Sequence, residues 1–139
     1  GISSLAMSFR VPIVFVNLSA IEYIFTFNTN IISIAKKMWL RQDERYLGFD
    51  EIFKKGIGRF LLSQNYEEFG IDLIENTPEE ITDVAIEMHE RLSGTWRTSM
   101  EEQVLQSKFW SLLPKSELHG DKVLSRVGTN YLEKYQKLL

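Results

Sequence analysis

A helix start that follows directly on a short strand constrains the fold of this chain more than any other feature. Thr77-Pro78-Glu79-Glu80 is a capping box with proline at the first helical position, where its missing N–H costs nothing. Before it, Ile71 to Glu75 has the apolar pattern of a strand. After it, apolar residues repeat every three or four positions until Gly94, namely Ile81, Val84, Ala85, Met88 and Leu92. A strand, a turn and a helix in this order predict an α/β fold.

The first seventeen residues predict a second unit of the same kind. Ser3 and Ser4 are suitable N-caps for a short helix, which Pro12 would end. Ile13 to Val16 reads as a strand buried on both faces, as in a parallel sheet. Ligands of such sheets lie beyond the carboxyl ends of strands and at helix N-termini, where free amides attract anions. Gly1, Ser3, Ser4 and Asn17 are therefore a candidate edge for binding a phosphate, although most turns of this kind in α/β domains bind nothing.

The middle of the chain is less regular. Ile21 to Ile34 is rich in aromatic and β-branched residues and predicts a strand or an extended loop. Lys36 and Lys37, close to Trp39, could hold a phosphate or a carboxylate, and they could equally form a solvated edge. Phe49 to Gly56 has acids in its first turn and lysines in its last, which predicts a helix. A second short helix is expected to end at Gly70.

The last third predicts two further helices. Thr98 or Ser99 opens the first, which carries Met100, Val104, Leu105, Phe109, Leu112 and Leu113 and ends at Pro114. The last helix is expected to place Val127, Tyr131, Leu132, Tyr135 and Leu138 on one face. Gly128 near its start indicates either a close packing contact or a helix that begins only at Thr129.

Composition limits the classes of function. A chain of 139 residues is large enough for one core, so we expect a single domain over 1–139. The absence of cysteine excludes disulfides and thiolate chemistry and fits a reducing compartment, which predicts a cytoplasmic protein. A net charge of −3 without a basic block argues against a nucleic-acid partner. No apolar run is long enough for a transmembrane segment.

Residue patterns for self-contained catalysis are not found in the sequence. His89 and His119 lie far apart, and His89 borders the apolar helical face, where we expect it to pack. No Asp-x-Asp triplet offers paired carboxylates to a metal, so neither a metal nor a cofactor is predicted. The remaining acid pairs are expected to be solvated or to cap helices; they are Asp43–Glu44, Asp50–Glu51, Glu67–Glu68 and Glu101–Glu102.

Several segments, taken in order, resemble one known family. They are Gly1-Ile-Ser-Ser-Leu-Ala, Pro12-Ile-Val-Phe-Val-Asn17, Lys36-Lys37-Met-Trp39, Phe49-Asp-Glu-Ile-Phe, Tyr66 to Ile81 with its Glu-Asn-Thr-Pro-Glu-Glu-Ile stretch, and Tyr131-Leu-Glu-Lys-Tyr135. Together they are similar to the C-terminal end of a bacterial family of GT-B glycosyltransferases linked to surface polysaccharide synthesis. The resemblance covers nearly the whole chain.

The resemblance implies a partial Rossmann-like domain that binds the diphosphate of a nucleotide-sugar donor. Gly1, Ser3 and Ser4 would meet that diphosphate, Lys36 or Lys37 would balance its charge, and Asn17 would line the cleft. The chain starts without methionine, at a glycine in the middle of a strand–turn–helix pattern, so we expect a piece of a longer protein. The catalytic base would then lie outside the chain, and catalytic residues within it stay unknown.

Two other readings stay open. The first is a non-catalytic α/β interaction module whose aromatic Ile21 to Ile34 segment packs against a partner or a second copy. The second is a domain like that of a sugar-nucleotide epimerase, although no catalytic acids or histidines of that kind can be placed here. In either a fragment or a module, exposed apolar faces would allow homo-oligomers to form.

Overall fold

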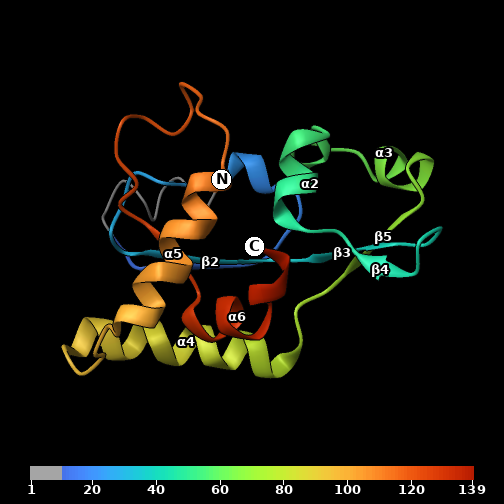
Figure 1. Ribbon diagram of the computed structural model, residues 1–139. Helices are drawn as coiled ribbons and strands as arrows, with labels where there is room; N and C mark the ends of the chain where they lie inside the picture. Colours follow the sequence, from blue (N-terminus) through green and yellow to red (C-terminus); the bar gives the residue numbers. More distant parts are fainter. Residues whose placement is uncertain (1–10) are drawn as a thin grey trace.

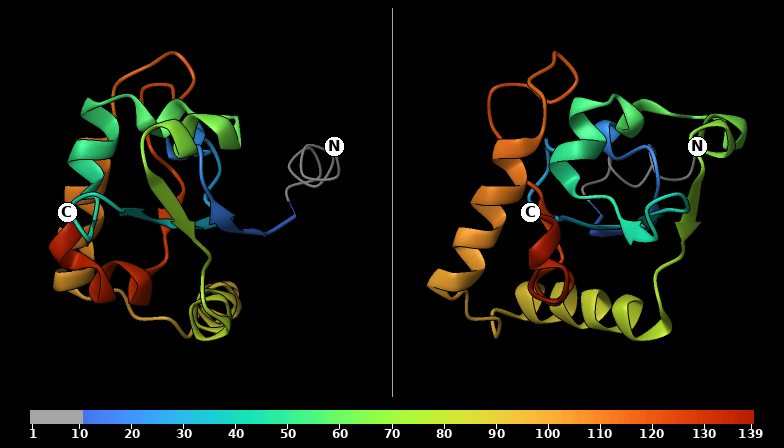
Figure 2. Two further views of the ribbon diagram at one scale, coloured as in Figure 1. Left: turned by 90° about the vertical axis from the view of Figure 1, so that its right-hand side faces the viewer. Right: turned by 45° about the vertical axis from the view of Figure 1, so that its right-hand side comes forward.

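A computed structural model describes residues 11–139 and places two small sheets end to end between layers of helices. Helices α4 (Pro78–Ser93) and α6 (Thr129–Lys134) lie on one side of the sheets, and α2 (Phe49–Lys54) and α3 (Ser63–Glu68) lie on the other (Figure 1). Helix α5 (Met100–Leu112) packs against α2 and α6. Figure 2 shows the same layers from two other directions.

The first sheet is parallel, as the sequence predicts. Strand β1 (Ile13–Leu18) pairs with β2 (Ile31–Ala35), and β2 pairs on its other side with β6 (Arg126–Val127). All five residues of β2 are buried, which is typical of the central strand of a parallel sheet. The α/β class and the predicted strand at Ile13 to Val16 are confirmed. The strand is only half-buried and not buried on both faces as predicted, because among the described residues β1 pairs with β2 alone.

The second sheet is antiparallel, which the sequence did not reveal. Its order is β4 (Arg45–Tyr46), β3 (Lys37–Leu40) and β5 (Ile71–Ile74). The predicted strand at Ile71 to Glu75 is confirmed as β5, which runs against β3 with Ile74 opposite Lys37. Only Lys36 separates β2 from β3, so one extended stretch of chain belongs to both sheets.

The segment Ile21 to Ile34 is neither one strand nor one loop. It begins with a short 3₁₀ turn at Ile21–Tyr23, continues as a loop, and ends in β2. Most of its apolar side chains are buried, while Tyr23 and Phe27 are exposed. The segment therefore contributes most of its apolar side chains to the core, and few of them to the surface.

The helix starts and ends follow the sequence closely. The Thr77 hydroxyl accepts a hydrogen bond from the Glu80 amide at 3.1 Å, and the Glu80 carboxylate accepts one from the Thr77 amide at 3.0 Å. Ser99 caps α5 in the same way through Glu102. Gly94 ends α4 in the left-handed conformation that glycine favours, at a φ of 74°. The two predicted short helices correspond to α2 and α3.

The buried face of α4 differs from the predicted apolar stripe. Val84 and Met88 are buried, but Ala85 and Leu92 are exposed. In their place, the helix buries the carboxylates of Glu80 and Glu87. The prediction was wrong here because a count of apolar residues cannot register buried charges that have partners.

Gly128 makes the close packing contact that its position predicts. Val127 belongs to β6 and not to the last helix, which begins at Thr129. A Cβ atom at position 128 would lie 2.8 Å from Ile34 Cγ2 in β2 and 3.4 Å from Val84 Cγ2 in α4. Glycine therefore lets β6 turn into α6 directly against the parallel sheet.

We expect Gly128→Ala to lower the free energy of unfolding by about 1–3 kcal/mol, the usual cost of overpacking a tight core. Chemical denaturation monitored by circular dichroism measures the change. Asn130→Ala, two residues along and exposed, is the matched control and should unfold like the wild type. An unchanged denaturation midpoint for Gly128→Ala would contradict this, because it would show that β2 and α4 can move apart without loss of stability.

Candidate functional site

The carboxyl ends of β1 and β2 meet at Asn17 and Lys36, and this junction is the candidate site within residues 11–139. The register of the two strands shifts between Phe15 and Leu18, and Asn17 takes the left-handed conformation at a φ of 56°. A left-handed conformation is uncommon for residues other than glycine, and asparagine tolerates it best. Asn17 therefore lies at an irregularity within β1, which ends one residue later, at Leu18, than the polar residue in the sequence predicts.

Asn76 holds this turn in place. The Asn17 amide donates to Asn76 Oδ1 at 2.6 Å, and the Asn76 amide donates to Asn17 Oδ1 at 2.7 Å. Asn76 Nδ2 also donates to the Ala35 carbonyl at 2.8 Å. Asn76 is buried and directly precedes Thr77, the cap of α4. One side chain thus joins the ends of β1 and β2 to the start of a helix.

The pair of bonds with Asn76 also fixes what Asn17 can offer a ligand. Because Asn17 Oδ1 accepts the Asn76 amide, its Nδ2 group carries the free hydrogen-bond donors. Within residues 11–139 no acceptor binds that Nδ2 group. The sequence predicts Asn17 at the end of a strand, and the structure adds which of its side-chain atoms is already hydrogen-bonded.

The two lysines of the predicted site have different surroundings. Lys37 is buried; its Nζ donates to Tyr135 Oη at 2.6 Å and lies 4.5 Å from the centre of that ring. Neighbouring residues in an extended chain point to opposite faces, so Lys36 points away from Tyr135. Lys36 is half-buried and forms no ion pair with any residue of 11–139. Ligand binding by either lysine stays a prediction.

Tyr135 links Lys37 to a buried carboxylate. Its hydroxyl donates to Glu80 Oε2 at 2.7 Å, and Lys134 Nζ lies 3.6 Å from the same oxygen. Burial opposes ionisation of Glu80, but the hydrogen bonds from Tyr135 and Thr77 and the lysine charges outweigh it and lower its pKa. Burial, together with the bond to Glu80, raises the pKa of the Tyr135 phenol. Glu80 is therefore a buried anion as well as a helix cap.

A second buried charge cluster joins α4, α5 and the start of α6. Glu102 accepts hydrogen bonds on one oxygen from Arg91, from Trp96 at 3.1 Å, from Arg126 at 3.1 Å and from Thr129 at 2.8 Å. Glu87 accepts from Arg91 Nε at 2.8 Å and from the Thr129 amide at 2.7 Å. Two carboxylates and two guanidinium groups balance one another, so the cluster is suited to holding helices together.

This cluster corrects one expectation from the sequence. Glu101 is exposed, as expected, but Glu102 is only 2% exposed and is not solvated. Its position as the fourth residue of a Ser99 capping box and the Glu87–Arg91 spacing of four were the available clues. Neither clue reveals that Arg126, 24 residues further along, reaches Glu102.

The two histidines also differ from expectation. His89 is exposed and does not pack in the core, so that prediction was wrong. His119 is buried, with Nε2 2.7 Å from the Glu22 carbonyl and Nδ1 3.1 Å from Ser116 Oγ. Both ring nitrogens therefore have partners, and the bond to Glu22 attaches the loop that follows α5 to the Ile21–Tyr23 turn. Residues 11–139 contain no group of three or more His, Asp or Glu side chains that could hold a metal ion.

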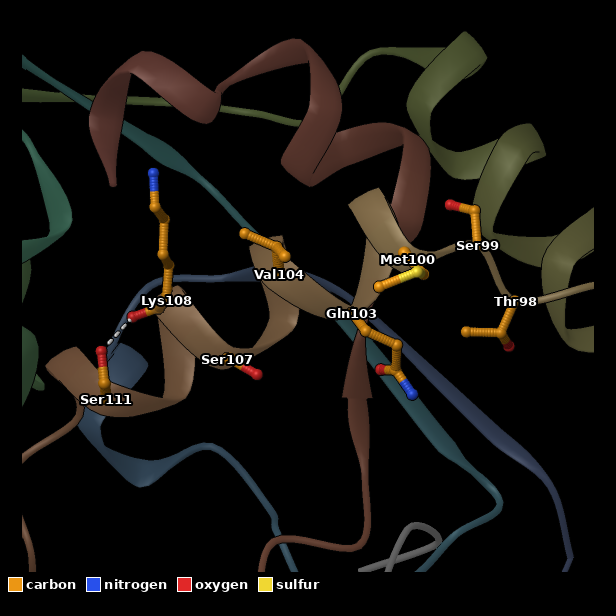
Figure 3. A pocket seen from close by; sticks show the side chains of 8 residues that line it. All are labelled: Thr98, Ser99, Met100, Gln103, Val104, Ser107, Lys108 and Ser111. Carbon is orange, nitrogen blue, oxygen red and sulfur yellow. Dashed lines mark hydrogen bonds between the residues drawn. The ribbon is translucent and has the colours of Figure 1, made fainter.

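Two hollows on the surface of the described residues lie away from the candidate site. One of about 760 Å³ runs along α5 and is lined by Thr98, Ser99, Met100, Gln103, Val104, Ser107, Lys108 and Ser111 (Figure 3). Within residues 11–139 its lining comes from a single helix and the two residues that precede it. Another, of about 540 Å³, lies beside Arg91 and Arg126. The Gln106 side chain there already bonds both the N–H and the C=O of Val127.

Gly1, Ser3 and Ser4 belong to the predicted site but lie outside the described residues.

Comparisons of the chain with protein-family models, with curated proteins and with solved structures find no match. In the described part of the chain, every helix is too short or too polar to cross a membrane. What the strand pairing shows is an α/β fold that contains a parallel sheet.

Breaking the Glu102 cluster should destabilise the chain strongly. We expect Glu102→Gln to lower the free energy of unfolding by about 3–5 kcal/mol, because two guanidinium groups lose their buried counter-charge. Glu101→Gln, its exposed neighbour, is the control and should stay within about 0.5 kcal/mol of the wild type. Equal denaturation midpoints for the two variants would contradict a structural role of the cluster.

The same carboxylates predict how stability depends on pH. Burial opposes ionisation of Glu102, but bonds from Thr129, Trp96 and Ser99 and the charge of Arg91 lower its pKa below the ordinary 4.5. The unfolded chain therefore binds the proton first as pH falls, and stability that is present above about 4.5 is lost below it. Denaturation at a series of pH values should show this loss, with a shallower slope for Glu102→Gln.

Proposed function

We propose that this chain is part of the donor-binding half of a glycosyltransferase and holds the diphosphate of a nucleotide-sugar at the carboxyl end of β1. The observation that carries the proposal is the parallel pairing of β1 with β2, which brings Asn17 and Lys36 to one edge. Ligands of open parallel sheets lie at this edge. The family resemblance of the sequence leads to the same segment.

The chemistry of the edge suits an anion. Asn17 Nδ2 supplies hydrogen-bond donors, and Lys36 supplies a positive charge that no acid in residues 11–139 neutralises. The serines predicted to cap the preceding helix, Ser3 and Ser4, would add backbone amides. Donors and charge placed around a leaving diphosphate stabilise the negative charge that develops as the sugar is transferred. In this proposal Lys37 supports the fold, since its ammonium donates to Tyr135, whose hydroxyl in turn donates to Glu80.

The interaction-module alternative depends on the Ile21 to Ile34 segment. Only Tyr23 and Phe27 remain exposed among its large apolar residues, at 42% and 53%. Two separate rings offer less area than a stable protein interface needs. Nucleotide binding is therefore the function that the geometry favours.

Titration with UDP, GDP and ADP should test the proposal. We expect millimolar nucleotide to shift the backbone amide resonances of Gly1 to Leu5, Asn17 and Lys36. Lys36→Ala should weaken binding about tenfold, as loss of a charged hydrogen bond does. Lys108→Ala, an exposed lysine on α5, is the matched control and should bind like the wild type.

Two results would contradict this function. One is a folded sample whose resonances do not move with any of the three nucleotides. The other is a set of shifts confined to residues away from the β1–β2 edge, unchanged by Lys36→Ala.

A further inference from the structure

The loop that follows α5, drawn in orange above that helix in Figure 1, places a serine hydroxyl against a buried imidazole. Ser116 Oγ lies 3.1 Å from His119 Nδ1, within hydrogen-bonding distance. Ser116 is exposed, whereas His119 is only 7% exposed. An accessible hydroxyl next to a base that is held in the core is the pairing that nucleophilic catalysis by serine requires.

The other ring nitrogen fixes which atom of the imidazole carries the proton. His119 Nε2 lies 2.7 Å from the Glu22 backbone carbonyl, and a carbonyl oxygen can only accept a hydrogen bond. Nε2 therefore carries the proton, and in the neutral ring Nδ1 has a lone pair. Because Nδ1 can then only accept, the Ser116 hydroxyl donates to it. The ring is in the tautomer of a general base, and its lone pair faces the serine.

Hydrogen bonds from two parts of the chain hold this pair in place. The Leu118 amide donates to Ser116 Oγ at 3.2 Å, and the His119 amide donates to the Ser116 carbonyl at 3.2 Å. The Thr26 hydroxyl donates to the His119 carbonyl at 2.8 Å, so the segment before β2 holds the histidine through its backbone as well as its ring. A serine oxygen has two lone pairs, and Leu118 occupies one of them. The other lone pair is available for attack on a substrate.

A hollow of about 540 Å³ opens beside the pair. Ser116 and His119 both line it, and its wall includes the apolar side chains Trp110, Leu113 and Val123. Its charged lining residues are one cation and two acids, namely Lys115, Glu117 and Asp121. An excess of acids disfavours an anionic ligand, so the hollow suits a neutral molecule with an apolar part. Ser116 also lines a second hollow of about 300 Å³, which leaves room beside it for both parts of an ester.

We propose that Ser116 and His119 form a nucleophile–base pair that hydrolyses neutral esters of short apolar acids. Ser116 Oγ attacks the ester carbonyl carbon while His119 Nδ1 takes the hydroxyl proton. The bond to the alcohol then breaks, and His119 returns the proton to the departing alkoxide, which leaves an acyl-serine. A water molecule that His119 deprotonates attacks the acyl group, releases the acid and restores Ser116. The Glu22 carbonyl is a positioning group, because it keeps the proton on Nε2.

A serine-directed alkyl fluorophosphonate tests the nucleophile in the whole chain. The serine oxygen attacks phosphorus and fluoride leaves, and peptide mass spectrometry should place the label on Ser116. Ser116→Ala should remove the label and lower hydrolysis of p-nitrophenyl butyrate at least about hundredfold. Ser111→Ala is the matched control, because the exposed Ser111 hydroxyl donates to the Lys108 carbonyl at 2.7 Å and faces no base. It should be labelled and hydrolyse the ester like the wild type.

A second measurement uses the absence of cysteine from the chain. Ser116→Cys and Ser111→Cys each contain a single thiol, and circular dichroism should show that both are folded. Iodoacetamide should alkylate Ser116→Cys at least about tenfold faster at neutral pH, because His119 favours the thiolate there. No label on the folded wild type, equal labelling of Ser116→Ala, or equal alkylation of the two cysteine variants would each overturn the proposal. In the last case the bond to His119 would only close a turn.

Discussion

The three hydrogen bonds that join Asn76 to Asn17 and Ala35 set the geometry on which the rest of the structure depends. Strands β1 and β2 run side by side, and after Lys36 the chain continues from β2 into β3, whose partners in the second sheet are β4 and β5. Such a change of partner leaves backbone groups of both strands without neighbours. Asn76 satisfies them with one buried side chain, and buried polar groups of this kind must have partners for the fold to be stable. Because Thr77 follows immediately, the same junction fixes where α4 begins.

Buried carboxylates then attach the helices to this frame. Glu80 joins the start of α4 to Tyr135, Glu87 joins its middle to the amide of Thr129, and Glu102 joins α5 to Arg91 and Arg126. Each of the three also has hydrogen-bond donors, which offset the cost of removing a charge from water. The helical layer is therefore specified by polar partners as much as by apolar packing, which explains why the apolar stripe of α4 is narrow.

Local chemistry made much of this fold predictable from the sequence. Thr77, Ser99, Gly94 and the β-branched run from Ile13 act over a few residues, and each gave the element that it predicts. The errors have one common cause: they depend on residues far apart in the sequence. Burial of Glu102 needs Arg126, and the change of sheet at Lys36 needs β5 and Asn76. The spacing of residues within one segment cannot predict contacts between residues that are far apart in the sequence.

The candidate site shows the same division between local and distant information. The sequence places Asn17 at a strand end, and that much follows from an apolar run and a polar residue. Its side-chain oxygen is occupied by the amide of Asn76, which lies 59 residues away, and no acceptor in residues 11–139 binds its Nδ2 group. Lys36 and Lys37 look equivalent as neighbours, but an extended chain turns them to opposite faces, and only Lys37 meets Tyr135. Lys37 Nζ already donates to Tyr135, whose hydroxyl donates to Glu80, whereas Lys36 forms no ion pair within residues 11–139. A lysine whose ammonium has a buried hydrogen-bond partner is less available to an anion. The contrast between these two adjacent lysines is the physical reason for proposing Lys36, and not Lys37, as the contact of a diphosphate.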